Sequence, residues 1–311
     1  MNTNKDVLLI DEEINLYELF LALWNRKVLI ISLTLIAAVI SVTYSLSIEN
    51  TYRSQVLLVQ SDSKTGGLAS SLGGLSGLAG IAGITLPTSS GSGRKQEAIA
   101  VLNSHQFLES FIIRHDLLVS IMAGTAWNKD NNKLVINPKI YDEVNNKWIT
   151  NSKKPSKPSL QEAVRNLRAL LGVATDKKNG YLTIYVDSFS PHVSKQWVDW
   201  LVQDINAYMR NDEVTKSERS LIYLNKQLNK TSISEIKNVL SQLIKSETQT
   251  IMLSESSSEY MFKTIDKAIV PELKLGPRRS IICIVGTLIG FFLSLMIALL
   301  HVYFRPTMQT A

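Results

Sequence analysis

The sequence predicts an α+β protein in which two transmembrane helices flank a large domain of strands and helices that contains a long helical hairpin. Two uncharged apolar runs stand near the ends of the 311-residue chain, at 28–46 and 281–304. Strand and helix periodicities alternate between these runs. From residue 191 a helical pattern then continues for about forty residues without an internal proline or glycine.

Each apolar run is long enough to cross the ~30 Å hydrocarbon core of a bilayer as a helix. Two uninterrupted runs of this length favour transmembrane helices over buried core helices. A cleaved signal peptide is an alternative for the first run, because Ser45 and Ser47 are small residues at a suitable alternation. However, the run exceeds the usual apolar length of such peptides, and an acidic segment precedes it. We therefore expect an uncleaved anchor and both termini on one side.

The charges beside the two runs leave the orientation open. Arg26 and Lys27 precede the first run, whereas three basic residues flank the second run on the loop side and only Arg305 follows it. The positive-inside rule is weak for a loop of this length, and the first helix usually sets the orientation. The only cysteine, Cys283, lies in the second run, so the loop is not a disulfide-stabilised domain.

The segment at 1–27 is expected to be a tail that contains an amphipathic interfacial helix. Its apolar residues recur at spacings of three and four: Ile10, Ile14, Tyr17, Phe20 and Trp24. Asp11 can cap this helix, and the glutamates that follow suit its positively polarised end. The pattern is typical of a helix that lies on a membrane surface.

The loop at 47–280 begins with a predicted strand at 51–60 and continues into a Gly/Leu-rich loop at 65–93. This glycine-rich segment is not a P-loop, because no serine or threonine follows Lys95. Its many leucines suggest a mobile loop that buries small apolar side chains against a neighbour, and plain disorder is the alternative. Residues 94–117 are predicted to be helical, with a break and a cap near Asn103 and Ser104.

Shorter elements follow. Two strand candidates lie at 134–140 and 147–149, and a capping box at Ser159 opens a helix to about Leu171. An alternating strand begins at Gly180. A last strand, within 260–270, is expected to return the chain to the membrane.

The long helical pattern predicts a helical hairpin at 191–254. Apolar residues keep a three-four spacing in its first helix, except in the polar section 211–220, which we expect to be solvated or to face a partner. A capping box at Ser232 is predicted to start the second helix. The short break between the helices makes an antiparallel hairpin.

The sequence contains no recognisable catalytic constellation. Its histidines are not at metal-ligand spacing from one another: His105, His115, His192 and His301. No nucleophile has an elbow motif, and the carboxylates are scattered. We therefore expect no enzyme activity, no catalytic residue, no cofactor, no metal and no nucleic-acid partner.

The clearest local signal is a face of small residues in the second run. The positions fall every fourth residue: Gly286, Gly290, Ser294 and Ala298. The first run offers a matching strip: Ala37, Ser41 and Ser45. Small faces let membrane helices approach closely. The sequence leaves three partners open for this face: the first run, another subunit or another membrane protein.

A connector at 271–280 precedes the second run. Pro271 and Pro277 each fix φ near −65° and disfavour helix in the residue before them. We expect them to keep the connector extended and stiff, so that the orientation of the domain is transmitted to the bilayer.

Several segments resemble the Wzz-type polysaccharide co-polymerases, the chain-length determinants of O-antigen and related surface polysaccharides. They are "DEEINLYELFLALWNRKVLI", the Gly/Leu-rich loop, "WVDWLVQDINAYMR", "SLIYLNKQLNKTSISEIKNVLSQLI" and "YMFKTIDKAIVPELKLGPRRSIICIVG". The chain departs from the family pattern at Lys274, where the family often has a third proline, and this loosens the connector.

The resemblance implies a bacterial inner-membrane protein with transmembrane helices at 28–46 and 281–304 and cytoplasmic termini, the second at 305–311. It also implies a periplasmic domain at 47–280 that has a small α/β base near the membrane and a long helical hairpin as its arm. It implies subunits that assemble into a ring and act with the membrane O-antigen polymerase without catalysing a reaction. Nascent lipid-linked polysaccharide is a further candidate partner.

Three other functions stay open from the sequence. An exopolysaccharide or capsule co-polymerase or export component is the alternative within the family. A two-span periplasmic sensor would share the arrangement of the chain but needs an output module. A glycan-processing enzyme would need two carboxylates ~5–10 Å apart in a cleft.

Overall fold

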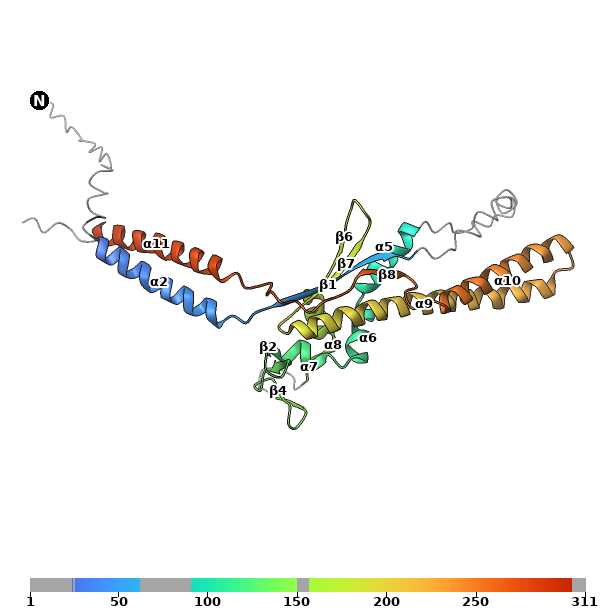
Figure 1. Ribbon diagram of the computed structural model, residues 1–311, viewed down its shortest axis with the longest axis horizontal. Coiled ribbons are helices and arrows are strands. Elements are labelled where there is room, and N and C mark those ends of the chain that lie inside the picture. The colour runs from blue at the N-terminus through green and yellow to red at the C-terminus, as the bar shows by residue number, and fades with distance from the viewer. Residues whose placement is uncertain (1–23, 25, 62–90, 150–156, 304–311) are drawn as a thin grey trace, which may run out of the picture. The chain divides into compact units, whose positions relative to one another are not determined.

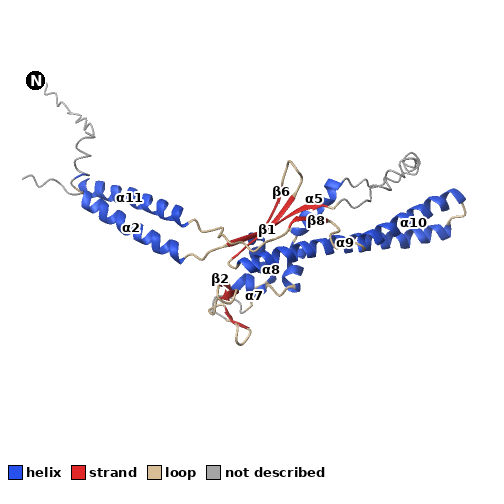
Figure 2. Cartoon of the chain, in the orientation of Figure 1, coloured by secondary structure: helices blue, strands red, loops and turns tan. Residues whose placement is uncertain are grey.

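The computed structural model describes residues 24, 26–61, 91–149 and 157–303. The chain divides into two compact units, of which one contains residues 1–49 and 276–311 and the other contains residues 50–275 (Figure 1). The predicted amphipathic helix, nearly all of the Gly/Leu-rich loop and the tail at 305–311 lie outside the described residues. Figure 2 shows the mixture of helices and strands, which confirms the predicted α+β class.

The first unit contains two helices that are long and apolar enough to cross a membrane. Helix α2 spans Lys27–Ser47 and helix α11 spans Arg279–Tyr303. The mean hydropathy is 2.2 over Lys27–Ser47 and 2.6 over Arg279–Leu300. Helix α2 contains the first apolar run, and α11 contains the second as far as Tyr303 and begins two residues before the predicted start at 281.

A four-stranded antiparallel sheet forms the base of the second unit, in the order β6-β7-β1-β8. Its strands are β1 (Tyr52–Gln60), β6 (Leu171–Thr175), β7 (Leu182–Ser188) and β8 (Phe262–Asp266). Every second side chain of β7 is buried, which is the pattern of a strand with one face in the core. The three strands predicted near residues 51, 180 and 260 are confirmed, whereas β6 lies where no strand was predicted.

Helix α8 (Leu160–Leu170) and the first half of helix α9 (Pro191–Lys230) pack on the buried face of this sheet. Helices α5 (Gly91–Leu102), α6 (His105–Arg114) and α7 (Leu118–Ala123) pack against α8 or α9. The predicted caps are confirmed, because the Ser104 hydroxyl accepts from Phe107 N–H at 3.2 Å and the Ser159 hydroxyl accepts from Glu162 N–H at 3.1 Å. The core joins side chains from both layers: Leu58, Phe111, Leu167, Ile184, Leu201 and Phe262.

Two small hairpins lie between α7 and α8. One pairs β2 (Gly124–Asn128) with β3 (Lys133–Ile136), and the other pairs β4 (Tyr141–Asp142) with β5 (Lys147–Trp148). The prediction that the first strand extends to residue 140 is wrong. The chain turns at Asn137, whose side chain accepts from Lys139 N–H at 2.9 Å, and Pro138 has no N–H to donate to a ladder.

The arm is a hairpin of two helices, as predicted. Helix α9 spans Pro191–Lys230 and has 40 residues, and α10 spans Ser234–Glu255. The predicted capping box at Ser232 is wrong, because Ile233 occupies the N-cap and no side chain caps α10. Helix α10 lies along the second half of α9 (Figure 1).

Candidate functional site

The small face of α11 packs against α2 of the same chain. A Cβ added at Gly286 would overlap the Ser41 side chain, and one added at Gly290 would overlap the Ala37 Cβ. Such close approach of two helix backbones requires glycine, because no other residue leaves space for the opposite side chain. Of the three partners that the sequence left open for this face, the structure places the first apolar run against it.

Polar contacts accompany this packing. The Ser41 hydroxyl donates to the Ile282 carbonyl at 3.0 Å, and the hydroxyls of Thr34 and Ser294 lie 3.3 Å apart. Ser294 and Ala298 are fully buried, and Ser45 is 1% exposed. The Ser45 hydroxyl has no hydrogen-bond partner among the described residues. The seven small residues selected from the sequence therefore lie in or beside the contact between α2 and α11, and the sequence did not indicate Thr34.

The connector is an irregular segment between β8 and α11. Within the second unit, the Leu275 N–H donates to the Thr51 carbonyl at 2.8 Å, next to the start of β1. Ser54 donates its hydroxyl to the Ile269 carbonyl at 2.8 Å. These bonds hold the residues on both sides of Pro271 beside β1. Pro277 belongs to the first unit and follows a cis peptide bond.

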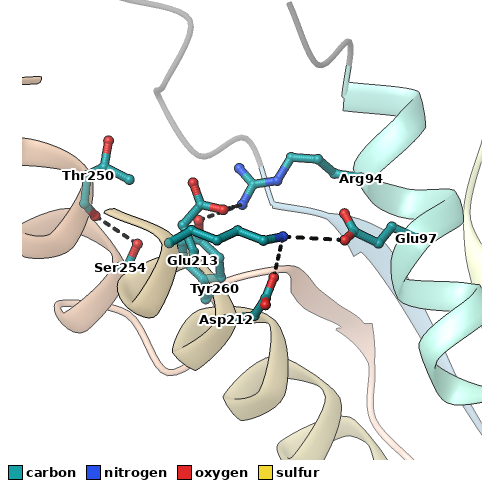
Figure 3. Close-up of polar contacts among 8 residues, drawn as sticks. Arg94, Glu97, Asp212, Glu213, Thr250, Ser254 and Tyr260 are labelled. Atoms are coloured by element: carbon teal, nitrogen blue, oxygen red, sulfur yellow. Dashed lines mark hydrogen bonds and ion pairs between the residues drawn. The ribbon is translucent and has the colours of Figure 1, made fainter. Parts of the chain in front are cut away.

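The polar section of α9 makes a cluster of contacts that we call the arm root. The Arg94 guanidinium, on α5, lies 2.8 Å from a Glu213 carboxylate oxygen and donates to the Tyr260 hydroxyl at 2.7 Å. Figure 3 shows Arg94 and Glu97 pointing from α5 toward α9. The arm root therefore joins α9 to α5 and to the segment just before β8.

A second ion-pair group lies beside the first. The Lys216 ammonium is 2.6 Å from the Asp212 carboxylate and 3.6 Å from the Glu97 carboxylate. The hydrogen bond to Asp212 raises the pKa of Lys216 above its usual value. Burial lowers the pKa of Arg94, but the hydrogen bond to Tyr260 and the charge of Glu213 outweigh it and raise the pKa. Both cations therefore stay charged at neutral pH.

These contacts correct one expectation. The polar section 211–220 was expected to be solvated or to face a partner, but the structure uses several of its side chains inside the chain. Ser217 is 3% exposed, and Asp212, Glu213 and Lys216 bind α5 or their own helix. Three further polar residues of the section, Asn211, Thr215 and Arg219, line a pocket.

This pocket lies between α6 and α9 and has a volume of about 480 Å³. At one end, Asp204 lies 2.8 Å from the Arg114 guanidinium and 3.1 Å from His115 Nε2. The His115 ring stacks on Trp200 with centroids 4.2 Å apart. Among the described residues, no group of three His, Cys, Asp or Glu side chains could hold a metal ion. No local pattern in the sequence predicts this pocket, because its two walls are about 100 residues apart in the chain.

Comparison with known proteins identifies one family. Residues 12–115 match the model of the chain length determinant protein family, Wzz. No curated protein matches the chain.

Two solved structures are similar. One is a full-length bacterial polysaccharide co-polymerase, with 15% identity, a TM-score of 0.41 and coverage of 95% of this chain and 100% of that chain. The other is a fragment of WzzB, a polysaccharide co-polymerase from Salmonella Typhimurium, with 12% identity, a TM-score of 0.31 and coverage of 73% of this chain and 100% of that chain.

The matched segment begins before α2 and runs through β1 and α5 to the end of α6. It therefore includes the first candidate membrane helix and the Gly/Leu-rich loop on which the resemblance partly rests. The match confirms the resemblance to the Wzz chain length determinant family over residues 12–115, which is about a third of the chain.

Proposed function

We propose that this protein is an oligomeric polysaccharide co-polymerase of the bacterial inner membrane. It regulates the modal chain length of the O-antigen lipopolysaccharide that a membrane polymerase makes. The match of residues 12–115 to the chain length determinant family carries this proposal. In the proposed topology, both termini are cytoplasmic and the domain at 47–280 is periplasmic. The protein itself makes and breaks no covalent bond.

The exposed apolar residues of the arm support assembly into an oligomer. Ile222 on α9 is 72% exposed, and Met252 on α10 is 65% exposed. Ile233, at the N-cap of α10, is also apolar and exposed, and so are three residues of α10: Ile236, Val239 and Leu253. Exposed apolar groups that gather on one element are typical of a surface that binds another protein. We propose that arms of neighbouring subunits bury these residues in a ring.

The packing of α2 on α11 supports a second part of the proposal. Exposed apolar residues cover the other faces of both helices, among them Ile40 at 62% and Phe292 at 64%. A tightly packed helix pair presents a fixed outer surface to lipid or to another membrane protein. We propose that this surface contacts the polymerase, and that the connector with Pro271 and Pro277 couples it to the domain.

The test is deletion of the gene in its own strain, followed by gel electrophoresis of the extracted lipopolysaccharide. Loss of the modal cluster of bands, and its return when the gene is supplied on a plasmid, are expected. An unchanged ladder would contradict the O-antigen proposal. A change in capsule or exopolysaccharide length instead would assign the chain to the alternative within the family.

A further inference from the structure

We propose that the pocket between α6 and α9 binds a stretch of saccharide chain. This inference rests on the proposed function, because it takes the polymer that is being lengthened as the ligand. It goes further by assigning a binding site for that polymer to particular side chains. The pocket lies wholly within the second unit, so its geometry is defined by that unit alone. Its volume of about 480 Å³ is within the range of small-molecule sites.

An aromatic ring in a fixed orientation forms part of the wall. The rings of Phe107 and Tyr208 meet edge to face, with centroids 6.0 Å apart and planes at 88°. Phe107 is 5% exposed and is held in the core, whereas Tyr208 is 42% exposed. The packing therefore fixes the Tyr208 ring while part of it stays open to a ligand. The C–H face of a sugar ring packs on an aromatic ring in such a position.

Neutral polar groups lie beside this ring. Gln106 and Ser110 come from α6, and Asn211 and Thr215 come from α9. Amide side chains offer donors and an acceptor together, which suits neighbouring hydroxyls on a sugar. The Thr215 hydroxyl donates to the Asn211 carbonyl at 2.7 Å, so its orientation is set by the helix. The pocket therefore combines the aromatic ring of Tyr208 with side chains that both donate and accept hydrogen bonds.

Both carboxylates that line the pocket are paired, and Arg219 is an exposed lining cation without an ion pair among the described residues. Asp204 is bound by Arg114 at 2.8 Å, and Asp212 is bound by Lys216 at 2.6 Å. A site for a phosphate or a highly charged chain would need several free cations that converge on it, whereas Arg219 is a single one. Paired charges instead hold the carboxylate oxygens in place to accept from hydroxyl groups. The ligand class that fits is therefore a neutral or weakly acidic saccharide.

The shape of the pocket fits a polymer. Its α9 lining runs from Asp204 to Arg219, which is a length of ~22 Å along the helix. This distance exceeds the size of a single sugar ring, so several rings of one chain can lie along it. Affinity is therefore expected to rise with the number of repeat units until the pocket is filled, and then to level off.

The experiment uses the full chain in lipid nanodiscs. The probe is the polysaccharide released by mild acid from the lipopolysaccharide of the strain that carries the gene, separated into fractions by length. Saturation-transfer NMR and titration calorimetry measure binding. Tyr208→Ala is expected to weaken binding about three- to ten-fold, and Tyr208→Phe is expected to retain most of it. Asn211→Ala is expected to weaken binding more than Asn225→Ala, which changes an exposed asparagine on the same helix outside the pocket.

The outcomes separate this inference from the proposed function. If wild-type protein binds no fraction at millimolar repeat-unit concentration, the pocket proposal is wrong, even when deletion of the gene still alters chain length. If wild-type protein binds and the Tyr208 and Asn211 variants bind equally well, the saccharide site lies elsewhere and the proposal is also wrong. If deletion leaves chain length unchanged while the pocket variants lose binding, the proposed function fails and the saccharide site stands. A circular dichroism spectrum for each variant shows that loss of binding is not loss of folding.

Discussion

The side-chain amide of Asn206 binds both backbone groups of Phe262, accepting from its N–H at 2.8 Å and donating to its carbonyl at 3.1 Å. The same amide accepts from the Met261 N–H at 2.8 Å and donates to the Val202 carbonyl at 3.1 Å. Asn206 is 2% exposed and Phe262 is fully buried. A single asparagine on α9 thus fixes the start of β8 inside the core.

Asn206→Leu is expected to destabilise the second unit by about 3 kcal/mol, because the N–H groups of Met261 and Phe262 lose their acceptor inside the core. Chemical denaturation of the purified chain, followed by tryptophan fluorescence, measures this change. Asn225→Leu on the same helix is the control, since Asn225 is exposed and should shift stability by no more than about 0.5 kcal/mol. Equal losses in the two variants would show that the Asn206 bonds add no stability.

Gly290→Leu is expected to separate α2 from α11, because its side chain would occupy the position of Ala37. The modal polysaccharide length should then shift while the protein still inserts. Gel electrophoresis of lipopolysaccharide measures length, and immunoblotting of membranes measures insertion. Ile289→Leu is the control, because Ile289 is 55% exposed on the neighbouring position. An unchanged ladder with Gly290→Leu would contradict a role for this helix pair in length control.

Arg94→Gln is expected to loosen the arm root by about 1–2 kcal/mol, because Glu213 and Tyr260 lose a partly buried, charge-assisted donor. Hydrogen exchange should become faster in α5 and around residues 210–217 of α9. Lys216→Gln is the comparison, and it should change exchange little because the Lys216 side chain is 57% exposed. If hydrogen exchange in α5 is the same in the Arg94 variant as in the wild type, the Arg94 contacts do not stabilise the arm root.

Ile222→Lys together with Met252→Lys is expected to lower the mass of the oligomer in detergent and in nanodiscs. Both positions are exposed in the single chain, so the substitutions leave its core intact, whereas a charge buried between arms would oppose association. Mass photometry measures the assembly. Ile222→Leu with Met252→Leu keeps the surface apolar and should keep the wild-type mass. An oligomer of unchanged mass in the lysine variant would place the subunit contact outside these residues.

Local signals account for the elements that the sequence predicted correctly. The caps at Ser104 and Ser159 and the alternation in β7 each depend on residues within one or two turns of the chain. The small face of α11 also depends on a local pattern, because its small residues recur at every fourth position of the sequence. Such features need no knowledge of the fold.

Tertiary contacts account for the remaining elements and for the errors. Strand β6 follows α8 directly at Leu171, and it is a strand because it pairs with β7. Ser232 fails as a cap because only three residues separate α9 from α10, which places Ile233 at the cap position. Arg94 and Glu213 are 119 residues apart in the sequence, so no local pattern predicts their ion pair.

The continuity of α9 has a mechanical consequence. Its first half packs on the sheet, and its second half is one of the two helices of the arm. The helix is continuous from Pro191 to Lys230. From Asn206 to Lys230 the helix extends ~36 Å, so a rotation of about 5° at the Asn206 pivot moves the far end by about 3 Å. The unbroken helix would therefore turn a small rotation of the base into a displacement of several ångströms at the end of the arm.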